Sequence, residues 1–323
     1  MAISAIIVIG AVLLLALLSG LAFLALSGSP AKEPRPAPAF RGQPAAQPPA
    51  TSGTPGQPAK VIESVEIVRL IAEGGMGEIY EGFDRVLRRK VALKRMKPEI
   101  RIDRVGKEAF LKEARIVAAL QHPNIVQIHS VIDTPQDLCL VFEYIDGVNM
   151  RDIIAEKGRL SVAEVRPVVR AACAALDFAH GRKVLHRDLK PGNIMVASSG
   201  TVKIMDFGIA RQAAVTLSRL TPGAVSGTMA YMSPEQHLGQ ERQPGDFYAL
   251  AASLYHMLAG DLPFPGPEHL TQKERLDYRP LSQAVPGLGP KVDAFMDKAF
   301  SRDPNARFQK ASDFLAGFEE AFG

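Results

Sequence analysis

The chain has 323 residues, of which 47% are hydrophobic and 22% charged, so it can bury a core and is not a disordered protein. Its net charge of +4 is small and spread along the chain, without a dense Lys/Arg block or interleaved aromatic residues, so we expect no nucleic-acid partner. The two cysteines, Cys139 and Cys173, argue against a disulfide scaffold or a zinc site and favour a reducing compartment.

Residues 3–26 carry no charge, and as a helix they would extend about 36 Å, enough to cross a hydrocarbon core of about 30 Å. The alternative is a cleaved secretory signal, but no Lys or Arg precedes this run, as one usually does in a signal. The first cations, Lys32, Arg35 and Arg41, follow it. By the positive-inside rule we expect residues 1–27 to be a single-pass anchor in the cytoplasmic membrane, with the N-terminus outside and the rest of the chain in the cytoplasm.

Residues 28–60 contain nine prolines mixed with Ala, Gln, Gly and Ser, and no apolar periodicity. This composition predicts a disordered or polyproline-like linker, to which we assign no chemistry.

From Val61 the sequence changes to an alternating pattern that is typical of β-strands. Residues 65–72 and 77–84 predict two strands joined by the turn Glu73-Gly74-Gly75-Met76. Glycines in such a turn let backbone N–H groups approach phosphates, although a glycine cluster between strands is usually only a tight turn. The next apolar strand ends in Lys94, which by itself would be an ordinary surface residue.

Residues 106–120 place apolar side chains at helical spacing. This helix carries two acids, Glu108 and Glu113, either of which could pair with Lys94. Further on, a buried-strand pattern at residues 138–142 is followed by a helical pattern that Ser161 is placed to cap.

Residues 186–208 contain His-Arg-Asp-Leu-Lys-Pro-Gly-Asn and then Asp-Phe-Gly. Asp188 is a carboxylate that can accept the proton of an attacking hydroxyl, and Lys190 is a cation within reach of a transferring phosphoryl group. Asn193 and Asp206 offer oxygen ligands for magnesium. Each alone could be a solvated loop residue, but the ordered set predicts a phosphoryl-transfer site.

Two short strands are predicted between these residues, at 194–196 and 201–205, joined by a turn that contains Gly200. The chain would therefore double back and bring Asp206 beside Asn193, so that the two metal ligands lie side by side.

The ordered motifs of residues 61–323 resemble those of eukaryotic-type protein kinases, in particular the eukaryotic-like Ser/Thr kinases of bacteria. The resemblance implies an α+β, bilobal protein kinase fold, with a small β-rich N-lobe over about residues 61–145 and a larger α-helical C-lobe over about 146–323. ATP and Mg²⁺ (or Mn²⁺) would lie between the lobes, and the γ-phosphate would pass to Ser or Thr hydroxyls of protein substrates. Lys190 and Thr228 favour the Ser/Thr class over tyrosine kinases.

The resemblance also assigns the nucleotide site. Lys94 would contact the α/β-phosphates and pair with Glu113, which matches the register of the family's regulatory helix better than Glu108 does. Ala72 departs from the family pattern, which has glycine there, and this departure could weaken nucleotide binding modestly. The residues expected to bind the nucleotide are Ala72, Gly74, Gly77, Ile79, Ala92, Lys94, Glu113, Glu143, Ile145 and Met195.

Two further roles implied by the resemblance are structural. Asp246 would brace the backbone of the catalytic loop, and Glu235 would form an internal ion pair with Arg307. Glu235 closes the Gly-Thr-x-x-Tyr-Met-Ser-Pro-Glu segment, which would end the activation segment and dock the protein substrate.

Arg187 precedes the catalytic Asp188, and a buried cation there without a counter-ion predicts a mobile activation segment. A phosphate would supply that counter-ion and order the segment. Of the available hydroxyls, at Thr216, Ser218, Thr221 and Ser226, we favour Thr221, phosphorylated between two copies of the chain in a transient homodimer. The simpler alternative is that these are ordinary loop hydroxyls.

Two other functions are weaker. A pseudokinase scaffold would bind ATP and partners without turnover, but such proteins generally lack the equivalents of Lys94, Asp188 or Asp206, and all three are present here. A small-molecule phosphotransferase would be expected to lack the Ser-Pro-Glu segment.

Overall fold

The computed structural model describes residues 61–74, 77–208 and 229–323. The predicted membrane anchor, the Pro-rich linker, Thr228 and the candidate phosphorylation sites lie outside these residues. Within them, no helix combines the length and the apolar character that crossing a membrane requires.

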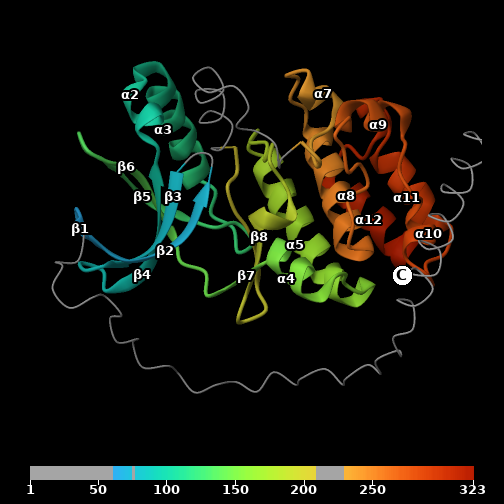
Figure 1. Ribbon diagram of the computed structural model, residues 1–323, viewed down its shortest axis with the longest axis horizontal. Helices are drawn as coiled ribbons and strands as arrows, with labels where there is room; N and C mark the ends of the chain where they lie inside the picture. Colours follow the sequence, from blue (N-terminus) through green and yellow to red (C-terminus); the bar gives the residue numbers. More distant parts are fainter. Residues whose placement is uncertain (1–60, 75–76, 209–228) are drawn as a thin grey trace, which may run out of the picture. The chain divides into compact units, whose positions relative to one another are not determined.

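The N-lobe is built on a six-stranded antiparallel sheet in the order β1-β2-β3-β4-β6-β5 (Figure 1). Val91 and Leu93, two residues apart on β4, lie on the same face of the sheet and pack with Cys139 and Val141 in a small core. The strands are β1 Val61–Ile62, β2 Val65–Gly74, β3 Gly77–Asp84, β4 Arg89–Met96, β5 Ile128–Asp133 and β6 Leu138–Glu143.

The other face of this sheet is covered by α3, Arg104–Ala118, which follows the short α2, Pro98–Ile102 (Figure 1). The side chain of Asp103 caps α3 by accepting a hydrogen bond from the backbone N–H of Gly106. Phe110 of α3 is buried in the same core cluster as Leu140 of β6. Because β6 is covered on both faces, its sequence is a continuous apolar run instead of an alternating one.

The C-lobe is mainly helical and contains a three-stranded sheet in the order β7-β8-β9. Strand β7 opens the lobe, whereas β8 and β9 follow α5 in the chain. The predicted division into a β-rich N-lobe and a helical C-lobe is therefore confirmed. The strands are β7 Gly147–Asn149, β8 Ile194–Ala197 and β9 Val202–Ile204, and the helices are α4 Met150–Lys157, α5 Val162–His180, α7 Pro234–His237, α8 Gln243–Ala259, α9 His269–Arg275, α10 Leu281–Ala284, α11 Lys291–Ala299 and α12 Ala311–Phe322, with 3-10 turns at Pro191–Asn193 and Pro304–Ala306.

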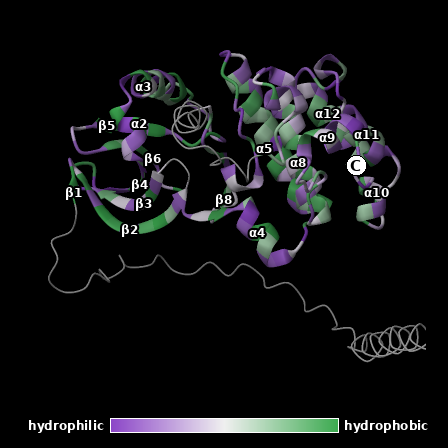
Figure 2. Cartoon of the chain, turned by 45° about the horizontal axis from the view of Figure 1, so that its top comes forward, coloured by the Kyte–Doolittle hydropathy of each residue, from purple (hydrophilic) through white to green (hydrophobic). Residues whose placement is uncertain are grey.

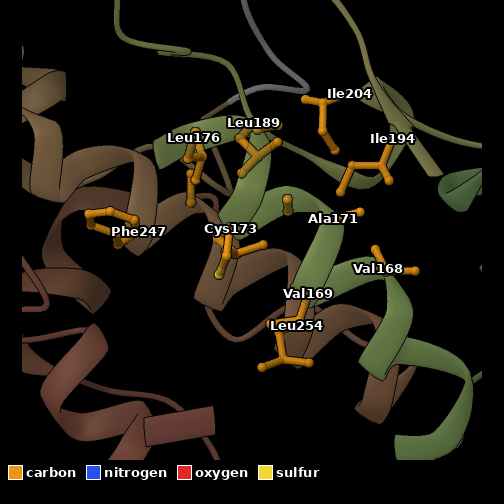
Figure 3. Close-up of a cluster of buried hydrophobic side chains, with 14 of the residues drawn as sticks. Val168, Val169, Ala171, Cys173, Leu176, Leu189, Ile194, Ile204, Phe247 and Leu254 are labelled. Carbon is orange, nitrogen blue, oxygen red and sulfur yellow. The ribbon is translucent and has the colours of Figure 1, made fainter. Parts of the chain in front are cut away.

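Helix α5 is the centre of the C-lobe core. Ser161 and Glu164 form a reciprocal capping box at its start, so the predicted cap is confirmed. Its buried stripe lies among Phe247 and Leu254 of α8 and Ile194 and Ile204 of the small sheet (Figure 3). Hydrophobic residues are frequent along both α5 and α8, as expected for helices packed inside a lobe (Figure 2).

The two lobes are joined by more than the covalent chain. The backbone N–H of Val126 donates to the carbonyl of Ile204 at 2.9 Å. Beside this link, Lys203 of β9 forms an ion pair of 2.8 Å with Glu143, the last residue of β6. Strand β9, which leads to Asp206, is thereby held against the edge of the N-lobe.

The predicted ion pair between Glu235 and Arg307 is confirmed. The guanidinium donates two hydrogen bonds of 2.8 Å to the two carboxylate oxygens, and the Arg307 side chain is 0% exposed. Burial alone raises the pKa of Glu235, but the hydrogen bonds and the charge of Arg307 outweigh it and hold that pKa below its usual value. The pair anchors α7 to the segment that precedes α12.

We expect Glu235→Gln to lower the free energy of unfolding by about 3 kcal/mol or more, because it leaves the buried guanidinium without a counter-charge. The control is Glu320→Gln, which removes an exposed carboxylate 3.9 Å from Lys291 and should change stability by less than about 0.5 kcal/mol. Urea unfolding of the three proteins measures both effects. Equal stabilities of the two variants would show that the pair is not a structural anchor.

Candidate active site

A cleft of about 460 Å³ lies between the lobes, a size that suits a small-molecule ligand. Its apolar wall includes Ala92 of β4, Ile145 after β6 and Met195 of β8. The lining also contains the five polar residues predicted to act on phosphate or on its metal ion, namely Lys94, Asp188, Lys190, Asn193 and Asp206. The predicted residues that line the cleft are Ala72, Gly74, Gly77, Ile79, Ala92, Lys94, Glu143, Ile145, Asp188, Lys190, Asn193, Met195 and Asp206.

The carboxylate of Asp188 is held by two donors of the catalytic loop. Lys190 Nζ donates to both of its oxygens, at 2.8 and 3.0 Å. Asn193 Nδ2 donates to the same carboxylate at 3.0 Å and to the backbone carbonyl of Asp188 at 2.7 Å. These contacts fix the orientation of a potential proton acceptor and place a cation directly beside it.

Asp246 of α8 holds the backbone of the loop that carries Asp188 through hydrogen bonds, as predicted. One carboxylate oxygen of Asp246 accepts from the backbone N–H of His186 at 2.9 Å, and the other accepts from that of Arg187 at 2.8 Å. The ring of His180 contacts it at 2.7 Å. Burial raises the pKa of Asp246, but the His180 ring and the backbone donors outweigh burial and hold the pKa below its usual value. Arg187 has a φ of +68°, a conformation that costs energy for any residue except glycine, so this bracing is needed.

His186 connects this loop to Asp206. Its ring is fully buried, and burial lowers its pKa, so the ring is neutral. Nε2 contacts the carbonyl of Met205 at 3.1 Å, while Nδ1 accepts from the backbone N–H of Asp188 at 3.3 Å. These contacts leave the ring no role in proton transfer, and we assign it a structural function.

Asp206 lies beside Asn193, as the predicted strand pair requires, because the backbone N–H of Met205 donates to the carbonyl of Asn193 at 3.0 Å. Lys94 Nζ is 2.9 Å from Asp206 Oδ1. Burial raises the pKa of Asp206, but the charge and the hydrogen bond of Lys94 outweigh it, so the pKa lies below its usual value and the carboxylate is ionised.

The predicted pairing of Lys94 with Glu113 is not formed, and Glu113 is not among the residues that line the cleft. Its carboxylate instead forms an ion pair with the guanidinium of Arg187. Helix α3 directs Glu113 toward Gly208, where an added Cβ would lie 2.9 Å from Glu113 Oε1. The nearby carboxylate of Asp206 takes the place beside Lys94.

The expectation that Arg187 lacks a counter-ion is also wrong. Besides its contact with Glu113, Arg187 Nε lies 2.7 Å from Glu241 Oε2. The Arg187 cation, next to Asp188, is therefore already paired with carboxylates from two distant parts of the chain.

The residues present fit a magnesium ion. Magnesium prefers hard oxygen ligands and is usually held by one or two carboxylates together with substrate phosphates. Since Asn193 Nδ2 is bound to Asp188 and Asp206 Oδ1 to Lys94, the oxygens left for a cation are Asn193 Oδ1 and Asp206 Oδ2.

The glycines before and after the β2–β3 turn line the cleft, as predicted. A Cβ at Gly77 would lie only 2.0 Å from the backbone oxygen of Arg95, so packing against β4 requires glycine here whatever the ligand. Ala72 pairs with Ile79 on the exposed part of β2, where a methyl group is accommodated.

Residues 65–316 match the family model of the protein kinase domain. The chain belongs to this family. The kinase is 36% identical over 268 residues to the serine/threonine-protein kinase PknB of Mycobacterium tuberculosis, a match that covers 80% of this chain and 43% of PknB. It is 36% identical over 253 residues to PknA of the same organism, covering 76% of this chain and 58% of PknA. The crystal structure of the M. tuberculosis PknI kinase domain is similar with a TM-score of 0.66 and 27% identity, over 81% of this chain and 98% of that one.

Several residues of the cleft were not predicted, among them Arg69, Val126, Arg151 and Met205. Met205 directly precedes the predicted Asp206, so its position in the motif could have indicated it. Val126 lies between α3 and β5, and nothing in the sequence around it indicates a contact with a ligand, so only the fold shows that it lines the cleft.

We expect Lys94→Met to lower turnover by about 100-fold or more, because it removes the cation that pairs with Asp206 at the phosphate end of the cleft. The matched control is Lys90→Met on the same strand, since the Lys90 side chain is 49% exposed and its contact with Glu81 lies outside the cleft. Steady-state assays of phosphate transfer measure both variants. Near-wild-type turnover of Lys94→Met would remove Lys94 from the active site.

Proposed function

We propose that this kinase transfers the γ-phosphate of ATP to Ser or Thr hydroxyls of protein substrates. The observation that carries the proposal is the convergence of Lys94, Asp188, Lys190, Asn193 and Asp206 in one interlobe cleft, which also has an apolar wall. The names of the relatives, serine/threonine-protein kinases PknB and PknA, support it. Because the chain spans about 43% of the length of PknB, the activity and substrates of the whole protein are part of the proposal.

In the proposed reaction, the acceptor hydroxyl attacks the γ-phosphorus, its proton passes to Asp188, and ADP leaves with the electrons of the broken P–O bond. Asp188 orients the hydroxyl, and Lys190 offsets the negative charge that develops beside it. Lys94 binds the α/β-phosphates, and the apolar wall of the cleft takes the adenine. Magnesium bound through Asn193 and Asp206 would neutralise charge on the phosphates.

A pseudokinase scaffold is the alternative function. Scaffolds of this type generally lack one of the groups that hold phosphate or orient the hydroxyl, whereas here Lys94, Asp188 and Asp206 all line one cleft. Catalysis is therefore the better proposal.

We also propose that the kinase autophosphorylates on Thr221, between two copies of the chain. The sequence-based reason was that Arg187 lacks a counter-ion, but Arg187 is already paired with Glu113 and Glu241, so a phosphate would have to replace them. A phosphate near Arg187 has to compete with Glu113 and Glu241, and with nearly two negative charges and three acceptor oxygens it is a stronger partner than a carboxylate. Displacement of Glu113 from Arg187 would free it to approach Lys94.

The membrane anchor is proposed from the sequence alone. The uncharged run of residues 3–26 and the cations that follow it support a single pass, with the N-terminus outside and the kinase in the cytoplasm, where ATP is available.

The test of catalysis is Asp188→Asn. We expect it to lower transfer to a protein acceptor by at least about 100-fold while nucleotide binding changes little, because the Asp188 carboxylate acts on the acceptor hydroxyl. Labelled ATP with a Ser/Thr-containing acceptor measures transfer, and a fluorescent ATP analogue measures binding. Wild-type turnover in the variant would refute the assignment of Asp188, and no transfer by the wild type would favour the scaffold.

The same two proteins test the regulatory proposal by mass spectrometry. The wild type should carry phosphate on Thr221, and Asp188→Asn expressed alone should carry none. An active wild type without phosphate between residues 209 and 228 would exclude this form of regulation.

The topology is tested by protease protection in spheroplasts of cells that express the full chain. The kinase should resist protease added outside and become sensitive after lysis, whereas a tag at residue 1 should be removed from intact spheroplasts. Digestion of the kinase from the outer face would contradict the proposed orientation.

A further inference from the structure

Lys273, on α9, is the one lysine of the described residues with a relative exposure of 0%. Within the described parts of the chain, its hydrogen-bond contacts are with two carbonyls and a histidine and not with a carboxylate, and burial lowers its pKa to about 7. A buried ammonium is costly unless its protons find acceptors, so the contacts that surround Lys273 need an explanation.

The ammonium has three N–H donors and three acceptors within hydrogen-bond distance. Two are backbone carbonyls, those of Met229 and of Met232, the latter at 2.7 Å. The third is His237 Nε2 at 3.2 Å. Burial and the charge of Lys273 lower the pKa of His237 to about 4, so the ring is neutral near pH 7 and Nε2 can accept.

Met229–Met232, here called the docking segment, continues directly from the activation segment into α7. A second contact holds it from the side of α8, where the hydroxyl of Tyr231 lies 2.8 Å from His256 Nδ1. The carbonyls of Met229 and Met232 accept from Lys273. Met229 as a residue is 37% exposed. The backbone of the segment is thus fixed by Lys273 and Tyr231, and Met229 is its exposed residue, whereas Ala230 is buried.

The docking segment is also connected to the catalytic loop. In α7, which follows it, Gln236 Nε2 donates to the backbone carbonyl of Arg187 at 2.5 Å, one residue before Asp188. The position of the docking segment relative to the catalytic carboxylate therefore depends on the packing of α7 and α9, and Lys273 forms the polar contact between these elements.

We propose that Lys273 is a positioning residue for the protein acceptor, which holds the docking segment through the carbonyls of Met229 and Met232 and so determines affinity for the acceptor without contacting ATP. The proposal rests on the proposed function, because docking of a protein at this segment is implied by the family resemblance. Lys273 is absent from the lining of the nucleotide cleft, which is why ATP binding should not depend on it.

The first test is Lys273→Met, which keeps an unbranched side chain, one atom shorter, and removes all three donors. With myelin basic protein as acceptor at about pH 6, between the pKa values of Lys273 and His237, we expect the acceptor KM to rise about tenfold or more. The KM for ATP and the rate of ATP hydrolysis without acceptor should stay within about twofold of wild type. Lys291→Met, the same substitution at an exposed position of the C-lobe, should leave every constant unchanged.

A second pair of variants keeps the ammonium and changes one acceptor. His237→Leu leaves one N–H of Lys273 without a partner and should raise the acceptor KM, whereas His237→Gln retains a carbonyl oxygen that can accept and should raise it less. This pair decides the question if Lys273→Met does not fold.

An unchanged acceptor KM in folded Lys273→Met overturns the proposal. So does an equal loss in acceptor phosphorylation and in acceptor-free ATP hydrolysis, since that result assigns Lys273 to the stability of the whole lobe.

Hydrogen exchange supplies a readout that does not need catalysis. In Lys273→Met, amide exchange should become faster in residues 229–238 and stay unchanged in the N-lobe. If the wild type phosphorylates no acceptor, the proposed function fails, yet faster exchange confined to this segment still supports the positioning role. Unchanged exchange there overturns it.

Discussion

The catalytic loop depends on one buried carboxylate. Asp246 accepts hydrogen bonds from two consecutive backbone N–H groups, those of His186 and Arg187, at the point where Arg187 adopts a left-handed conformation. The two oxygens of one carboxylate, at the length of an aspartate side chain, accept both bonds. The orientation of Asp188, and through Lys190 and Asn193 that of the phosphate end of the cleft, follows from this support.

Around this loop, the cations of Lys94 and Arg187 form ion pairs with three carboxylates. Asp206 neutralises Lys94, while Glu113 and Glu241 neutralise Arg187. Because these groups are partly buried, moving one carboxylate requires a replacement for it, whether a phosphate, a metal ion or another carboxylate. A change of partner at Arg187 would therefore involve α3, the helix that carries Glu113.

The sequence predicted the two lobes, the capping of α5 and the Glu235–Arg307 pair, because each depends on local patterns or on spacings that the family resemblance supplies. The predicted pair of Lys94 and Glu113 was wrong. Which carboxylate lies beside Lys94 depends on the position of α3 relative to the C-lobe, and no local sequence pattern encodes that position. Lys273 was not singled out, because nothing in its neighbourhood in the sequence distinguishes a buried lysine from a solvated one. Likewise, Gly77 was explained by access to phosphate, whereas the structure adds close packing against β4.

The ties between Val126 and Ile204 and between Glu143 and Lys203 lie at the end of the cleft that is expected to take the adenine. If one lobe rotated against the other with these contacts intact, they would limit the change in width at the base-binding end, whereas the glycine turn carries no such restraint among the contacts described above. A flat aromatic ligand at the base end would then meet nearly the same walls at different angles between the lobes. A ligand that extends to the phosphates would instead bind with an affinity that depends on the angle between the lobes.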